Sequence, residues 1–291
     1  MDTPNIATYR PLAELLPAEW QTGTITTNDN AHIHYTRTGG NKPPVILLHG
    51  FQVSGITWLR TAEALVGYDV IMPDFRGHGL SSGIENGFSA EILTDDVATL
   101  IRALKLDKVF VVGHSMGGEI AGRLAATHPD LVRAVVLVDP PLRSFNLPPV
   151  DLDNPPAWLQ PTVNALRVIK TQPHEERLKT MQTLIAPGSS QWHEIDYVTA
   201  AEAAAQFDLK TFNARMDYQL ATPQMIQQIT CPILLMTSRG MPGTDVAQTV
   251  KPITDNWHDG EYVHFADSGH FIMADQFEGF ITVLTNFLSD N

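Results

Sequence analysis

The sequence GHSMG at residues 113–117 constrains the fold of this chain more than any other feature. An apolar run, residues 108–112 (KVFVV), precedes it, and residues 118–126 (GEIAGRLAA), rich in alanine and glycine, follow it. A serine with a glycine two positions away on each side, between a strand and a helix, is typical of a nucleophile elbow. The turn strains the serine backbone, and a Cβ atom two residues away would collide with it. The pattern predicts that the hydroxyl of Ser115 projects from the turn, and that the amide of Met116 lies at a helix N-terminus that favours an oxyanion.

The composition is that of a soluble globular protein. The chain has 291 residues, of which 43% are hydrophobic and 18% are charged. The formal net charge of -13 argues against nucleic acid and anionic membrane surfaces as partners, since both bind basic patches. The sequence contains no transmembrane run and no signal-peptide pattern. With the single cysteine, Cys231, these features predict a cytoplasmic protein.

Apolar runs that alternate with helical patterns indicate the fold class. Residues 21–38 have the pattern of an antiparallel hairpin, and later runs are continuous and rich in β-branched residues. Such runs, separated by amphipathic helices, indicate a parallel sheet that is covered on both faces. The runs before the middle of the chain are residues 45–48, 69–72, 108–112 and 135–138.

The pattern changes between Pro140 and Ile229, where strand-like runs give way to helical stretches punctuated by prolines. These stretches are residues 156–170, 174–185, 191–207 and 209–220. The sheet pattern resumes at residues 233–236 and 261–265, before a C-terminal helix. We therefore expect a core of residues 21–140 and 230–291, an inserted helical cap of residues 141–229, and an N-terminal arm of residues 1–20.

Three further motifs follow strand-like runs, in an order that is diagnostic. They are HGF at residues 49–51, DFRGHGLS at residues 74–81 and SGHF at residues 268–271. With the elbow, they resemble the α/β-hydrolase superfamily over nearly the whole chain from residue 21, and in particular its capped serine esterases and lactonases. The resemblance implies an α/β fold with a mostly parallel eight-stranded sheet, flanked by helices, and an inserted helical cap.

The resemblance also implies a catalytic triad and an oxyanion hole. Ser115 is the predicted nucleophile, and His270 would accept its proton and return it to the leaving group. The backbone N–H groups of Phe51 and Met116 are the predicted oxyanion hole. His49 and His114 are instead expected to form hydrogen bonds with the backbone of the motif loops.

The acid of the triad is where this sequence departs from the commonest family pattern. Most members carry it shortly after the strand that corresponds to residues 233–236, but here no carboxylate follows until Asp245. Asp139 directly follows residues 135–138, where some members place the acid. We favour Asp139 and keep Asp245 as the alternative. An aspartate before a proline can also simply cap a turn.

The resemblance and the cap together suggest the kind of substrate. Aromatic residues of the cap could enclose an apolar pocket, and Trp158, Trp192 and Phe271 are the predicted substrate contacts. The serine at the elbow indicates acyl chemistry, because related epoxide hydrolases and dehalogenases carry an aspartate there. The sequence therefore predicts hydrolysis of a hydrophobic carboxylic ester or lactone through an acyl-enzyme on Ser115.

Two alternatives use the same fold. One is hydrolysis of a carbon-carbon bond next to a ketone by the same triad, and the other is a non-catalytic receptor for a small molecule. The sequence has no metal-ligand cluster, Walker loop or dinucleotide fingerprint, so no metal and no cofactor is expected. The predicted partner is a small hydrophobic molecule, and the sequence leaves its identity and the oligomeric state open.

Overall fold

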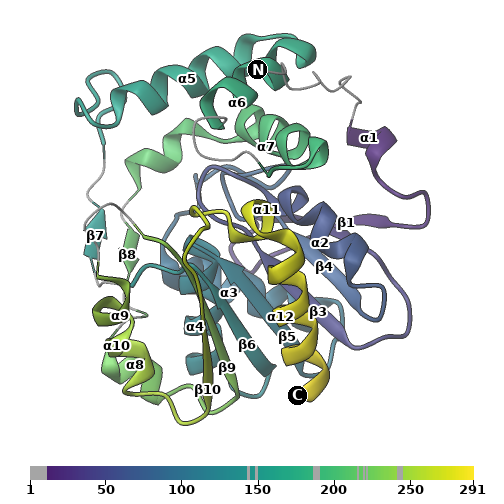
Figure 1. Cartoon of the computed structure of the whole chain (residues 1–291). Helices are drawn as coiled ribbons and strands as arrows, with labels where there is room; N and C mark the ends of the chain where they lie inside the picture. Colours follow the sequence, from purple (N-terminus) through teal and green to yellow (C-terminus); the bar gives the residue numbers. More distant parts are fainter. Residues whose placement is uncertain are drawn as a thin grey trace.

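Eight strands form one mostly parallel sheet in the computed structural model (Figure 1). The described residues are 12–142, 145–147, 150–185, 191–214, 216–218, 220, 222–240 and 245–291. The strand order is β1-β2-β4-β3-β5-β6-β9-β10, in which β2 is antiparallel to β1 and to β4 and all other neighbours are parallel. The strands are β1 (Gln21–Thr26), β2 (His32–Arg37), β3 (Pro44–Leu48), β4 (Asp69–Pro73), β5 (Val109–His114), β6 (Val132–Val138), β9 (Ile233–Ser238) and β10 (Gly260–Phe265).

Helices cover both faces of this sheet, as the continuous apolar strands predict. Alternate residues of β3 show the arrangement, because Ile46 and Leu48 pack into one hydrophobic cluster and Val45 and Leu47 pack into another. The first cluster includes α3 and α4, and the second includes α2 and α12. The helices that precede β6 or follow β9 are α1 (Leu12–Leu15), η1 (Gly55–Trp58), α2 (Leu59–Ala64), α3 (Ala90–Ala103), α4 (Met116–Thr127), α9 (Val246–Thr249), α10 (Lys251–Thr254), α11 (Ile272–Asp275) and α12 (Phe277–Asp290). The short helix α8 (Pro223–Gln227) lies between β6 and β9, shortly before β9.

A helical insertion between β6 and β9 lies over one end of the sheet (Figure 1). It contains α5 (Gln160–Thr171), α6 (His174–Ile185) and α7 (Glu194–Gln206). The insertion and the mostly parallel sheet confirm the predicted fold class. The domain boundaries at residues 20, 140 and 229 stay predictions, and residues 1–11 of the predicted arm lie outside the described ranges.

One predicted helix of the insertion, residues 209–220, is wrong. The structure has a single 3-10 turn, η2 (Leu209–Asn213), in which the Asp208 side chain accepts a hydrogen bond from the amide of Lys210. The chain then forms β8 (Met216–Tyr218), which pairs antiparallel with β7 (Phe145–Leu147). The local pattern could not reveal β8, because its pairing partner is distant in the sequence.

The parallel pairing gathers the motif loops at one edge of the sheet. The loops after β3, β4, β5, β6, β9 and β10 all follow the carboxyl ends of their strands. In an open α/β sheet, ligands bind at this edge. The helical insertion covers it.

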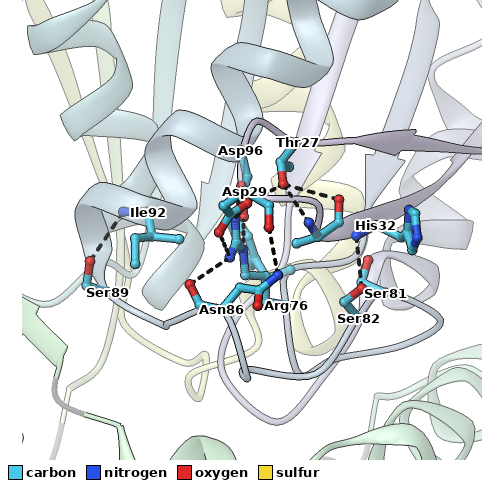
Figure 2. A network of polar contacts seen from close by, with 12 residues as sticks. Thr27, Asp29, His32, Arg76, Ser81, Ser82, Asn86, Ser89, Ile92 and Asp96 are labelled. Carbon is cyan, nitrogen blue, oxygen red and sulfur yellow. Dashed lines mark hydrogen bonds and ion pairs between the residues drawn. The ribbon is translucent and has the colours of Figure 1, made fainter.

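A buried arginine fastens the loop after β4 to its surroundings. Figure 2 shows the Arg76 guanidinium between the carboxylates of Asp29 and Asp96, and Nε and Nη2 of Arg76 each lie 2.7 Å from an Asp96 oxygen. Arg76 also bonds to Asp29, in the turn between β1 and β2. Burial raises the pKa of Asp96 despite these bonds, whereas the hydrogen bond from Arg76 lowers the pKa of Asp29. The β1–β2 turn, the loop after β4 and α3 thereby share one buried cation.

Arg76→Met is expected to destabilise the fold, because it leaves the buried Asp96 carboxylate without its partner. Removal of one partner of a buried ion pair costs about 3–5 kcal/mol, and urea denaturation would measure the change in the free energy of unfolding. Lys210→Met is the control, since Lys210 pairs with Glu85 at the surface and its loss leaves stability almost unchanged. Equal stabilities of the two variants would contradict this role of Arg76.

Candidate active site

Ser115 occupies a strained turn between β5 and α4. Its backbone angles are φ 53° and ψ -118°, which a residue with a Cβ atom rarely adopts. The amide of Ser115 donates a hydrogen bond to the carbonyl of Val138 at the end of β6, at 2.9 Å. Met116 is the first residue of α4, so its amide lies at the N-terminus of a twelve-residue helix. The partial positive charge of such a terminus favours an anionic oxygen.

Glycines make this turn possible by close backbone approach. A Cβ atom on Gly113 would lie 2.1 Å from the carbonyl oxygen of Gly117, and one on Gly117 would lie 2.3 Å from the carbonyl oxygen of Leu48. The sequence predicts that such a Cβ atom would collide with the serine. In the structure it would instead collide with the backbone of Gly117 and of Leu48. Gly50 plays a similar part, since a Cβ atom added to it would lie 3.2 Å from Cβ of Ser115. The loop after β3 thereby approaches the elbow closely.

Asp139 and His270 come together from the ends of β6 and β10. Nδ1 of His270 donates a hydrogen bond to Oδ2 of Asp139 at 2.6 Å. Ser238, at the end of β9, donates from its amide to Oδ1 of Asp139 at 2.8 Å and from its hydroxyl to Oδ2 at 2.9 Å. Burial opposes ionisation of Asp139, but the hydrogen bonds from His270 and Ser238 outweigh it and hold the pKa of Asp139 below its usual value.

Sequence reasoning missed Ser238, because the predicted strand ended two residues earlier. Only the register of β9 against β6, with Met236 paired to Val138, places it beside Asp139. Asp245, the alternative acid, lies elsewhere and begins α9. Its carboxylate accepts a hydrogen bond from the amide of Gln248, and the side chain is exposed.

His114, the residue before the elbow serine, supports the His270 loop. Nε2 of His114 donates a hydrogen bond to the carbonyl of His270 at 2.8 Å. Burial, reinforced by the nearby His270, lowers the pKa of His114 to about 3, so its ring is neutral at physiological pH.

The loop after β3 is held by a second neutral histidine. Nδ1 of His49 donates to the carbonyl of Gly50 at 2.7 Å, while Nε2 accepts from the amide of Phe75 at 2.9 Å. Burial lowers the pKa of His49 to about 4. The predictions that His49 and His114 bond to the backbone are confirmed. These bonds position the loop that carries Phe51, whose amide is the predicted first oxyanion donor.

Ser115 and His270 line the same cavity, which has a volume of about 490 Å³. The helical insertion supplies most of its wall, and His270 is the one ionisable side chain among the described residues that line it. Small residues of α5 and α7, Ala165, Ala200 and Ala204, leave room above the serine. The other lining residues are Phe51, Gln52, Val53, Pro161, Thr162, Leu166, Ile169, Met181, Leu184, Ile185, Trp192 and Phe271.

The three predicted substrate contacts have different positions. Trp192 and Phe271 line the cavity, and their rings meet edge to face with centroids 5.3 Å apart. Trp158 does not line it, since 70% of its surface is exposed to solvent. The substrate contact at Trp158 therefore stays a prediction, which the lining of this cavity does not support. Trp158 precedes the first turn of α5, and a sequence pattern could not fix its direction there.

The chain belongs to the alpha/beta hydrolase fold family, whose model matches residues 43–277. An esterase of Mycobacterium tuberculosis is 42% identical over 104 residues, 35% of this chain and 35% of that protein. A soluble epoxide hydrolase of a Corynebacterium species is 38% identical over 108 residues, 37% of each chain. These matches span less than half of either relative.

Solved structures agree on the fold. The N-formylmaleamic acid deformylase of Pseudomonas putida superposes with a TM-score of 0.72 at 24% identity, over 91% of this chain and 100% of that one. Among the described residues, no helix is long and apolar enough to cross a membrane, and no cluster of three metal-ligating side chains occurs.

Asp139→Asn is expected to slow the reaction of Ser115 with a fluorophosphonate by about 10⁴-fold, as amide substitution does in serine hydrolase triads. The Ser238 amide holds the oxygen of the new side chain, so its NH₂ group faces His270. Nδ1 of His270 must then accept, which leaves Nε2 protonated and unable to take the serine proton. Labelling rates measured by mass spectrometry test this.

Asp245→Asn is the matched control, and it should react at the parent rate because Asp245 caps α9 away from His270. If Asp245→Asn were the slower variant, the acid would have to be reassigned.

Proposed function

We propose that this protein is a serine hydrolase that cleaves carboxylic esters or lactones with a substantial apolar part. One observation carries the proposal. Ser115, on a strained turn, shares an apolar cavity with His270, and Nδ1 of His270 lies 2.6 Å from the Asp139 carboxylate. This is the residue set that acyl transfer requires, namely a nucleophile, a base and a group that orients the base.

In the proposed mechanism, Oγ of Ser115 attacks the substrate carbonyl while Nε2 of His270 takes the hydroxyl proton. The amides of Phe51 and Met116 stabilise the oxyanion, and loss of one such donor typically costs about 3 kcal/mol in transition-state stabilisation. The carbon-oxygen bond to the alcohol breaks, and the alcohol leaves with the proton from His270. Water, deprotonated by His270, then attacks the acyl-enzyme. The acyl–oxygen bond breaks, His270 returns the proton to Oγ of Ser115, and the acid is released. From a lactone, both halves remain in one product.

The cavity supports a neutral, apolar substrate. Burial of a charged group without a partner is costly, and among the described lining residues only His270 could become charged. Aliphatic and aromatic side chains form most of the remaining wall. An acyl group that ends in methyl is therefore favoured over one that ends in a carboxylate.

Hydrolysis of p-nitrophenyl butyrate, monitored by the absorbance of nitrophenolate, tests this function. The p-nitrophenyl monoester of succinic acid, whose acyl group ends in a carboxylate, is the charged substrate for comparison. The butyrate is expected to react faster, with a higher kcat/KM, because its terminal methyl group suits the cavity. Ser115→Ala should lower kcat by at least about 10³-fold. Ser289→Ala, near the end of α12, should keep the parent rate.

Two outcomes would contradict the proposal. Equal rates for Ser115→Ala and the parent would exclude Ser115 as nucleophile. Thermal stabilisation by esters without turnover would indicate a receptor instead.

Ala204→Leu tests whether the substrate occupies the space under α7. The larger side chain projects into the cavity, so kcat/KM for a p-nitrophenyl octanoate should fall more than that for the acetate. The ratio between the two esters should change by about 10-fold, the scale of one or two methylene groups in an apolar pocket. Ala157→Leu, at an exposed position of the insertion, should leave this ratio unchanged. An unchanged ratio for Ala204→Leu would mean that the acyl chain lies elsewhere.

A further inference from the structure

The loop that carries His270 depends on a few hydrogen bonds for its position. Residues 266–271 form neither helix nor strand, and 50% of the His270 side chain is exposed. Besides the bond to Asp139, His114 binds the carbonyl of His270, and the Arg239 amide binds the carbonyl of Ser268. The loop is thus tied to the ends of β5, β6 and β9, all of which belong to the sheet.

Asp275 connects the His270 loop to the helical insertion. It lies in α11, five residues after His270, and only 6% of it is exposed. Its Oδ2 accepts a hydrogen bond from the amide of Gly269, next to His270, at 2.8 Å. Its Oδ1 accepts from Nε1 of Trp192, also at 2.8 Å. One buried carboxylate therefore joins the His270 loop to the helical insertion.

Trp192 contacts the loop on both sides of His270. Through Asp275 it is linked to Gly269, and its ring packs edge to face on Phe271 at an interplanar angle of 71°. The same indole lines the cavity beside Ser115 and His270. A substrate group in this cavity would touch the residue that holds both neighbours of His270.

We propose that Asp275 is a positioning residue that couples the substrate contact at Trp192 to the orientation of His270. This proposal rests on the proposed serine hydrolase function. An apolar substrate group that packs on the indole holds Trp192 in place, and the Trp192–Asp275–Gly269 hydrogen bonds fix the loop. The imidazole is then held in the position for proton transfer from Ser115. Small displacements of a catalytic group are sufficient to lower the rate strongly.

Trp192→Phe and Asp275→Asn test the proposed coupling by changing its substrate contact and its positioning residue, respectively. Phenylalanine keeps an aromatic ring against Phe271 but lacks the indole N–H. Asparagine has one acceptor and one NH₂ donor, so it cannot accept from both Trp192 and Gly269. Each variant should lower kcat for p-nitrophenyl butyrate by about 10-fold or more. For Asp275→Asn, KM should stay within about two-fold, because Asp275 does not line the cavity and its substitution disturbs alignment rather than binding.

The double variant distinguishes coupling from general damage. If the two residues act through one hydrogen bond, Trp192→Phe combined with Asp275→Asn should be no slower than Asp275→Asn alone. Trp257→Phe is the matched control for the loss of an indole, because Trp257 packs on the hydrophobic cluster that includes α3 and α4 and does not line the cavity. It should keep the parent kcat.

A second readout does not depend on turnover. The Nε1–H resonance of Trp192, assigned by its loss in Trp192→Phe, should be protected from hydrogen exchange in the parent. Asp275→Ala, which has no side-chain acceptor for either donor, should abolish this protection. Circular dichroism and thermal unfolding of each variant show whether the fold is intact.

The outcomes separate the two proposals. If the parent hydrolyses the ester and both single variants keep kcat within about two-fold, or if their effects multiply in the double variant, the coupling through Asp275 is refuted and the hydrolase function stands. If the parent neither hydrolyses esters nor reacts with a fluorophosphonate, the hydrolase function fails, and the coupling fails with it.

Discussion

The bend at Ser115 is the constraint on which the rest of the site depends. A left-handed backbone at a serine is unfavourable, and it is held here because neighbouring backbones leave no space for relaxation. Gly113 packs on Gly117, Gly117 packs on the end of β3, and Gly50 packs on Ser115. The first turn of α4 can lie so close to the end of β3 and to the loop after it only because all three positions lack a Cβ atom. The same close approach brings the Phe51 loop to the N-terminus of α4.

Buried neutral histidines join the loops around this bend. His49, His78 and His114 are almost fully buried, and burial lowers the pKa of each. A neutral imidazole can donate from one nitrogen and accept at the other, and His49 uses both to join the loops after β3 and β4. His270 differs, since half of its side chain is exposed and its Nδ1 meets a carboxylate. The surroundings of each ring thus separate histidines that stabilise loops from the proposed base.

The sheet and the insertion contribute different properties to the site. The carboxyl ends of the strands carry Ser115, Asp139 and the loop with His270, and they are held rigidly by backbone hydrogen bonds. The insertion contributes the apolar wall of the cavity and therefore the proposed choice of substrate. The two parts meet where Asp275 binds both Trp192 and Gly269. The proposed chemistry and the proposed selectivity would be connected at this contact.

The sequence by itself determined the fold class and the elbow, because strand patterns, glycine spacing and helix signals are local properties of the chain. It also restricted the acid to Asp139 or Asp245, but only the structure shows which of them meets His270. The tertiary structure alone decided that Ser238 supports Asp139, that residues 216–218 form a strand, and that Trp158 faces solvent while Trp192 lines the cavity. These features depend on strand register and on helix orientation in the insertion. Both are set by contacts between residues far apart in the chain, which no local pattern encodes.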